Sequence, residues 1–103
     1  MAIKTSNVTT IATSIYTSSG NSATTVMHFC NYSNNNATAN VWVVPNGTAT
    51  ANSICMIYSN VTITNFNTMV IDTEKLILAN GDAIYANCSA NLSVGATISY
   101  IGI

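Results

Sequence analysis

The chain has 103 residues, of which 49% are hydrophobic and only 5% are charged, and its formal net charge is −1. Nucleic-acid binding requires several Lys or Arg side chains to neutralise phosphates, and only Lys4 and Lys75 are present, so we expect no nucleic-acid partner and no anionic membrane partner. No apolar run approaches the ~20 residues of a transmembrane helix. The length predicts a single domain over residues 1–103.

Short segments with strand character follow one another along the chain. The first covers residues 7–16, where Thr9, Ile11, Thr13 and Ile15 would share a face, and a turn follows at residues 18–21. Residues 24–32 are apolar on both alternating sets, which predicts a strand buried on one face and covered on the other. The next strand spans residues 37–44 and stops at Pro45, and residues 48–53 are a predicted loop.

The second half of the chain continues the pattern. Residues 54–58 predict a short strand or a helical turn, and residues 61–64 and 68–71 predict strands. Residues 83–89 and the alternating segment 94–101 predict the last two strands. Seven or eight short strands separated by turn residues indicate an all-β fold, an antiparallel β-sandwich of the Ig-like or jelly-roll-like type.

Three cysteines, Cys30, Cys55 and Cys88, are widely separated and form no CxxC pair, which argues against a zinc or redox motif. Each lies in an apolar run, where a reduced cysteine behaves as a small hydrophobe. We therefore expect buried thiols, with a Cys30–Cys88 or similar bridge as the alternative. The N-terminus lacks the apolar core of a secretory signal, so we expect a chain made in the cytoplasm or already mature.

Four of the five charged residues, Asp72, Glu74, Lys75 and Asp82, fall within eleven positions. A strand would hold the carboxylates of Asp72 and Glu74 about 6.6 Å apart, a separation that a glycosidase pair could use. Turn formation explains more of the segment, because Asp72 suits a strand end and residues 80–82, Asn-Gly-Asp, suit a tight turn before the next strand. We favour the structural interpretation.

His28 is the single histidine, and it could complete a Ser-His-Asp set only through Asp72 or Asp82. A histidine in an apolar strand is more simply a packed, hydrogen-bonded residue. With so few titratable groups, the sequence predicts no catalytic residues, no cofactor-binding residues and no metal ligands. We expect the protein not to be an enzyme.

The aromatic residues admit two interpretations. Trp42 and five tyrosines could line a carbohydrate platform, or Trp42 could be a core residue or an interface anchor. We favour core or interface and predict interface anchors at Trp42, Tyr58 and Phe66. A surface rich in amides and hydroxyls but poor in charge, with Pro45 as the only proline to guard a sheet edge, predicts a component of a multimeric assembly. The tyrosines are Tyr16, Tyr32, Tyr58, Tyr85 and Tyr100.

Three segments resemble the small β-sandwich virion proteins of tailed bacteriophages, especially those of marine cyanobacterial phages. They are "TTIATSIYTSSGNSATTVMHFCNYS", "NVWVVPNGT" and "DTEKLILANGDAIYANCSANLSVGATISYIGI". The last contains an LxLxxGDxI pattern that precedes a closing hairpin in such proteins, and here Leu76, Leu78, Gly81, Asp82 and Ile84 occupy it.

The resemblance implies a non-enzymatic virion protein without cofactors, made in the host cytoplasm. Its implied role is that of a capsid decoration or cement protein that reinforces contacts between major capsid subunits. The alternatives are a tail, neck or fibre accessory protein, or a glycan-binding module for host attachment.

Overall fold

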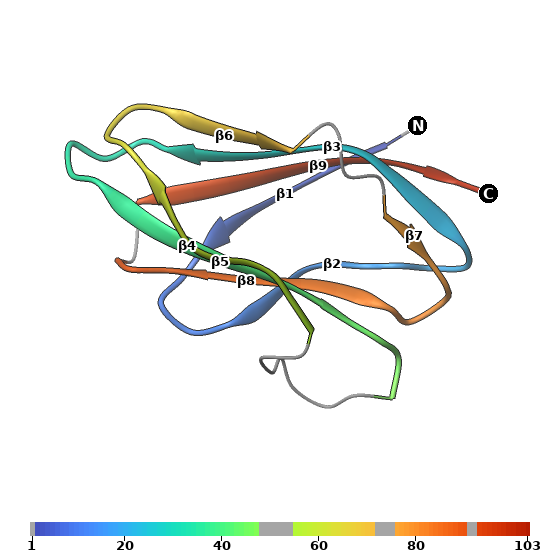
Figure 1. Cartoon of the computed structure of the whole chain (residues 1–103). Coiled ribbons are helices and arrows are strands. Elements are labelled where there is room, and N and C mark those ends of the chain that lie inside the picture. The colour runs from blue at the N-terminus through green and yellow to red at the C-terminus, as the bar shows by residue number, and fades with distance from the viewer. Residues whose placement is uncertain (1, 48–54, 72–75, 91–92) are drawn as a thin grey trace.

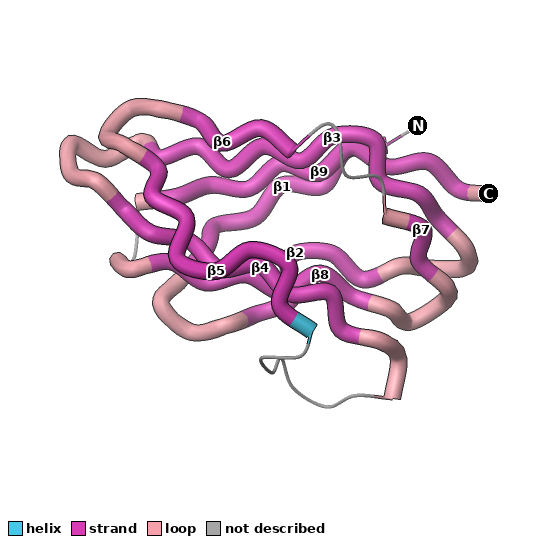
Figure 2. The backbone as a smooth tube through the Cα atoms, viewed as in Figure 1, coloured by secondary structure: helices cyan, strands magenta, loops and turns pink. Residues whose placement is uncertain are grey.

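The computed structural model describes residues 2–47, 55–71, 76–90 and 93–103. Most of this part of the chain is extended, as Figure 2 shows. The strands are β1 (Ala2–Val8), β2 (Thr13–Thr17), β3 (Ser22–Asn31), β4 (Ala37–Val44), β5 (Met56–Ile63), β6 (Thr68–Ile71), β7 (Ile77–Leu78), β8 (Ala83–Cys88) and β9 (Val94–Gly102).

Two antiparallel sheets face each other (Figure 1). Sheet A has the order β1-β9-β3-β6, with the short β7 also paired to β3, and sheet B has the order β2-β8-β4-β5. Four of the pairings are nested along the sequence, as in one long hairpin. From the innermost outward they are β4 with β5, β3 with β6, β2 with β8 and β1 with β9. Rolling that hairpin adds the pairings β3 with β9 and β4 with β8. The strand order is therefore that of a jelly roll, with β7 as an addition, and the predicted β-sandwich is confirmed.

The core lies between the sheets and follows from strict alternation. In β9, Val94, Ala96 and Ile98 are buried while the residues between them are only half-buried. Phe29 and Met27 of β3 are fully buried on the same side. Burying a side chain of this size stabilises the fold by about 1.5–3 kcal/mol, so this inner layer is the main source of stability.

Several predicted strands agree closely with the structure. Residues 37–44 form β4, residues 68–71 form β6, and the Pro45 stop is followed by Gly47 with a φ of 93°. Residues 56–63 are one strand, where two segments were predicted, and it passes through Asn60 at a φ of 51°. The predicted loop at residues 48–53 lies outside the described residues.

The predicted strand over residues 7–16 is wrong. β1 ends at Val8 in sheet A, and β2 begins at Thr13 in sheet B. The Thr9 hydroxyl donates to the Ile11 carbonyl at 2.9 Å, and the Thr9 carbonyl accepts from the Cys88 amide at 2.9 Å. Local bonding of this kind bends the backbone, because it gives the peptide groups an alternative to the ladder. Ile11 is consequently 73% exposed and does not share a buried face with Ile15.

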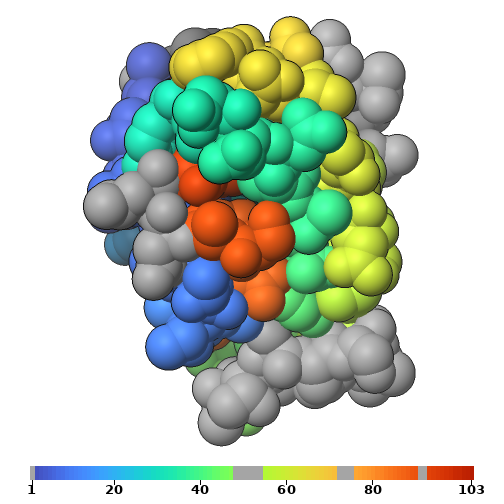
Figure 3. All heavy atoms as spheres, turned by 90° about the vertical axis from the view of Figure 1, so that its left-hand side faces the viewer, coloured from blue at the N-terminus to red at the C-terminus, as the bar shows by residue number. Residues whose placement is uncertain are grey.

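A buried asparagine ties the two sheets together at one end of the sandwich. Asn31 is fully buried, and its amide nitrogen donates to the carbonyls of Asn35 (2.8 Å) and Ile63 (2.9 Å). Its amide oxygen accepts from the backbone amide (3.0 Å) and hydroxyl (2.7 Å) of Ser33. Figure 3 looks onto this end, where the teal β3–β4 connection lies between the yellow β5–β6 connection and the orange end of β8. We call it the Asn31 end.

Candidate functional site

The one described carboxylate of the charged cluster, that of Asp82, is used for structure. Its oxygens accept from the backbone amides of Asn46 (2.8 Å) and Ala79 (2.9 Å), which fixes the turn before β8. Gly81 beside it has a φ of 87°, a conformation that glycine adopts without strain. The preference for a turn at residues 80–82 is confirmed. Asp72, Glu74 and Lys75 lie outside the described residues.

His28 is half-buried on the outer face of sheet A, between Thr97 of β9 and Val70 of β6. It lies six positions along β3, about 20 Å, from Ser22, and Ser22 pairs with Leu78, which directly precedes the turn that holds the Asp82 carboxylate. His28 and Asp82 are therefore not brought together. Within the described residues, no group of three His, Cys, Asp or Glu side chains is placed to hold a metal ion, and no helix is long and apolar enough to span a membrane.

The cysteines differ from one another in exposure. Cys88 is buried, Cys55 is half-buried, and Cys30 is exposed on the outer face of sheet A. All three are free thiols. The prediction of a buried thiol is confirmed for Cys88 and wrong for Cys30, because Cys30 occupies the outward position of β3 between the buried Phe29 and Asn31. The alternative of a Cys30–Cys88 bridge does not occur.

The three predicted interface anchors lie in different environments. Trp42 is 8% exposed, and its strand position places it on the outer face of sheet B, beside Tyr85 and Met56, outside the buried cluster between the sheets. Tyr58 packs partly buried against that cluster. Phe66 is 66% exposed, so it alone of the three offers a large free surface, and it holds a φ of 58° in the turn between β5 and β6.

Tyr85 is half-buried beside the nearly buried Trp42, and the other tyrosines do not extend this pair into an exposed platform. Tyr16 is buried, and its ring lies 4.6 Å from that of Tyr100 in a tilted pair. Its hydroxyl donates to the buried Ser22 hydroxyl at 2.9 Å. Tyr32 is the one large exposed tyrosine among the described residues, with 46% of its surface accessible. If the protein binds a carbohydrate, Tyr32 is therefore a better candidate for the contact than Trp42, which is only 8% exposed.

The outer face of sheet A carries two different surfaces. Near the ends of the chain, Ile101 of β9, Ala23 of β3 and Ile77 of β7 form one row across three strands. Ile3 of β1 lies diagonally beside Ile101. Exposure is 75% for Ile77, 66% for Ile3, 67% for Ile103 and 40% for Ile101. We call Ile3, Ile77, Ile101 and Ile103 the aliphatic patch.

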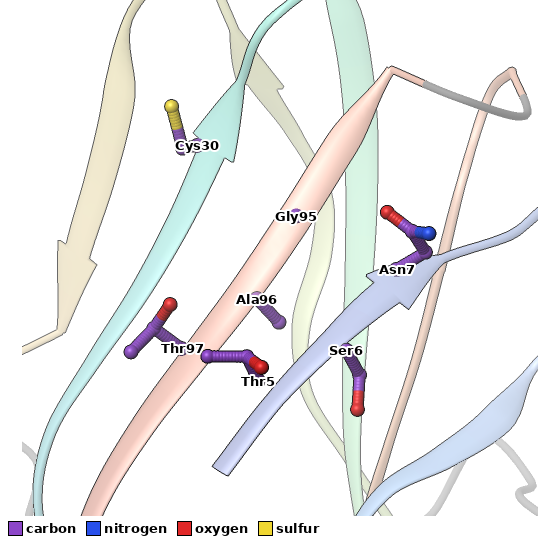
Figure 4. Close-up of a pocket in the computed structure, with 7 residues that line it drawn as sticks. All are labelled: Thr5, Ser6, Asn7, Cys30, Gly95, Ala96 and Thr97. Atoms are coloured by element: carbon purple, nitrogen blue, oxygen red, sulfur yellow. The ribbon is translucent and has the colours of Figure 1, made fainter. Parts of the chain in front are cut away.

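Toward the Asn31 end, the same face has a shallow hollow of about 450 Å³. Figure 4 shows the labelled residues around Gly95 of β9, with Thr5 and Thr97 side by side and Asn7 and Cys30 on either flank. Ser6 and Ala96 complete the lining. The volume lies within the range of small-molecule sites. Polar atoms of the rim are hydroxyl, amide and thiol groups, so the hollow is neutral. We call it the Gly95 hollow.

No contact among the described residues requires a glycine at position 95. Its φ is not in the left-handed region, and the pairing of β9 is regular on both sides of it. Among the residues that the structure describes, a Cβ atom added there would come within 4 Å of Cε1 of Tyr32 alone, at an ordinary contact distance of 3.9 Å. Glycine in a strand interior costs about 0.5–1 kcal/mol relative to alanine and often marks a place where a ligand or another backbone approaches closely.

A second hollow, of about 380 Å³, lies at the open side of the sandwich between β1 and β2. Lys4 lines it together with Tyr16 and Tyr100. Lys4 is on the inward-facing set of β1, opposite Ile98, yet it is exposed. An inward-pointing charge on an edge strand opposes the addition of a further strand, so we assign Lys4 to protection of that edge.

Comparisons with known proteins give no family: no family model, curated protein or solved structure matches the chain.

Sequence reasoning missed the Gly95 hollow because residues 94–101 were interpreted only through their alternation. The available signal was a glycine inside a strand without a turn residue beside it. The aliphatic patch was missed because residues 76–78 are all apolar, which gives no sign that one of them faces outward. In the structure only Leu78 is fully inside the core, and Ile77 is exposed.

Proposed function

We propose that this protein is a non-enzymatic structural protein of a virus particle, a decoration protein that reinforces contacts between major capsid subunits. The aliphatic patch carries the proposal. Exposed isoleucines on neighbouring strands are unfavourable in water, and clustered apolar surface of this kind marks protein contact sites. The described strands of this face contain no Asp or Glu, and the lysine of β1 points to the other face. An uncharged partner surface would therefore lose little solvation on docking.

The fold and the chemistry of the chain support the same role. Jelly rolls are used by viral capsid and lectin domains, although a shared fold alone does not assign a function. The scarcity of titratable groups disfavours acid-base chemistry, and Asp82 is committed to its turn. A tail, neck or fibre role would use the same patch against a different virion protein.

The test is to locate the protein in a particle that carries it, by electron cryo-microscopy, and to compare the heat resistance of particles with and without it. We expect the aliphatic patch to contact the major capsid protein and the particles to lose heat resistance without this chain. Equal robustness would remove the cement role. Density on the tail, neck or fibres would assign the accessory role instead, and turnover of a substrate by the isolated chain would overturn the proposal.

A charge placed in the patch tests which surface docks. Ile77→Asp should weaken attachment to particles at least tenfold, because a carboxylate would be buried in an apolar contact; tenfold corresponds to about 1.4 kcal/mol. Ile77 is 75% exposed, so the fold itself should lose little. Thr62→Asp adds the same charge at an exposed position on sheet B and is the matched control.

A further inference from the structure

We infer that the Gly95 hollow is a binding site for a neutral saccharide, with the exposed ring of Tyr32 beside Gly95 as an adjoining apolar surface. The inference is independent of the aliphatic patch. Ile101 lies six positions along β9 from Gly95, so the two sites lie about 20 Å apart on the same face. A protein held to a particle through the aliphatic patch would still leave the hollow open.

The floor of the hollow is the first argument. An L side chain at position 95 would clash with none of the described residues, and the backbone does not need glycine there. A glycine at such a strand position often marks a place where a ligand approaches the backbone closely, and we assign Gly95 that role. Sheet A supplies the rest of the site through its register, which places Asn7, Gly95, Cys30 and Thr68 in one row across four strands.

The surroundings of the hollow supply the second argument, because an apolar ring and polar lining groups suit the two kinds of surface that a sugar presents. Tyr32 is 46% exposed, and its ring edge borders the space above Gly95. An exposed aromatic ring provides apolar area against which the C–H face of a pyranose can pack. The hydroxyls of Thr5 and Thr97 and the amide of Asn7 line the hollow and both donate and accept hydrogen bonds, as sugar hydroxyls require.

Charge gives the third argument and narrows the ligand class. The seven residues that line the hollow include no Asp, Glu, Lys, Arg or His. A sulfated or sialylated sugar would lose hydration there without gaining a cationic partner, and burying an unpaired charge is costly. The site therefore favours uncharged sugars over acidic ones.

Rigidity supports the assignment, since an ordered site loses less entropy on binding. Tyr32 follows the fully buried Asn31 directly, and its backbone amide donates to the Ser93 carbonyl at 2.8 Å. The Asn31 backbone amide donates to the Asn67 carbonyl at 2.8 Å, which holds β3 to the turn before β6. The ring that would stack on the sugar is thus anchored through its own backbone.

The experiment is a glycan array probed with the fluorescently labelled full chain, followed by titration of the best neutral oligosaccharide and of an acidic counterpart. We expect binding to neutral glycans and at least tenfold weaker binding to sulfated or sialylated versions of the same sugars. Gly95→Val should fill the hollow and weaken binding at least tenfold, while the melting temperature stays equal or rises, because β-branched residues suit strands. Tyr32→Ala should weaken binding similarly.

The controls separate this site from the docking surface. Ala23→Val adds bulk to the same face near the aliphatic patch and should leave sugar affinity unchanged, as should Ile77→Asp. Unaltered affinity in Gly95→Val, or a lower melting temperature in that variant, would overturn the inference. An array without any bound glycan would overturn it too. If Gly95→Val then blocked contact with a protein, the hollow would be a site for a neighbouring chain and not for a sugar.

Discussion

Removal of the Asn31 side chain should cost the fold far more than the size of that residue suggests. The Asn31 amide uses both of its hydrogens and both of its acceptor positions, on Asn35, Ile63 and Ser33. Asn31→Ala leaves the buried Ile63 carbonyl without this donor, at about 1–3 kcal/mol, and removes three bonds to partly exposed groups of Asn35 and Ser33, which water can partly replace, at about 1 kcal/mol in all. We expect a total loss of about 2–4 kcal/mol.

A second substitution at the same position distinguishes hydrogen bonding from packing. Asn31→Asp keeps the shape of the side chain but replaces its NH2 group, which donates two bonds, by an oxygen that can only accept. That oxygen then faces the carbonyls of Asn35 and Ile63. At neutral pH this variant should be less stable than Asn31→Ala, since it buries a charge against two carbonyl oxygens. Burial raises the pKa of the new carboxyl above its unfolded value of about 3.9. The folded state then binds more protons than the unfolded state, so the unfolding free energy should fall as pH rises above about 4.

The assay is guanidinium denaturation followed by the fluorescence of Trp42, the single tryptophan. A loss of 2–4 kcal/mol also corresponds to a melting temperature lower by roughly 10–25 °C for a domain of this size. Asn34→Ala, an exposed position in the same loop, is the control and should stay within about 0.5 kcal/mol of the wild type. If Asn31→Ala loses less than about 1 kcal/mol, or Asn31→Asp is no worse than alanine at neutral pH, the described role of this side chain is wrong.

Three further substitutions or reactions test other local features. Phe66→Asn should raise the unfolding free energy by up to about 1 kcal/mol, because asparagine tolerates a positive φ better and an exposed ring contributes little packing; a clear loss in thermal unfolding would show that the ring packs within the fold. Gly81→Ala should cost about 1–3 kcal/mol in chemical denaturation, since its φ is 87° and the new Cβ would lie 2.5 Å from Cγ of Asn46; a neutral result would contradict the described turn. Iodoacetamide followed by mass spectrometry should modify Cys30 quickly and Cys88 only after unfolding; equal rates would refute the assigned exposures.

Sequence patterns located strands well where alternation and turn residues agreed. Residues 37–44 satisfy both, because an alternating run ends at Pro45 and a glycine with positive φ follows. Residues 7–16 satisfy only the first. Their alternation continues through a corner at residues 9–12, which the bond from the Thr9 hydroxyl stabilises. Alternation of polar and apolar residues alone does not distinguish a straight strand from a segment that passes from one sheet to the other.

The pairing of the strands could not be predicted because it depends on contacts between distant residues. β1 pairs with β9, at opposite ends of the chain, and no local pattern specifies that choice over an Ig-like order. The candidate site is missing from the sequence interpretation for the same reason. Thr5, Cys30 and Gly95 come from three segments and become neighbours only when β9 lies between β1 and β3.

The structure also shows how the sheet edges of a protein with so few charges are protected against pairing with other chains. The sequence offered Pro45 alone as edge protection, yet each outer strand has its own device. β1 turns Lys4 inward, β2 and β5 pair through irregular registers, and β6 is only four residues long. Bulges, inward charges and short strands all hinder the addition of another strand. Association by edge-to-edge pairing is thereby disfavoured, and the contacts proposed above use side chains on the outer face of sheet A instead of backbone groups.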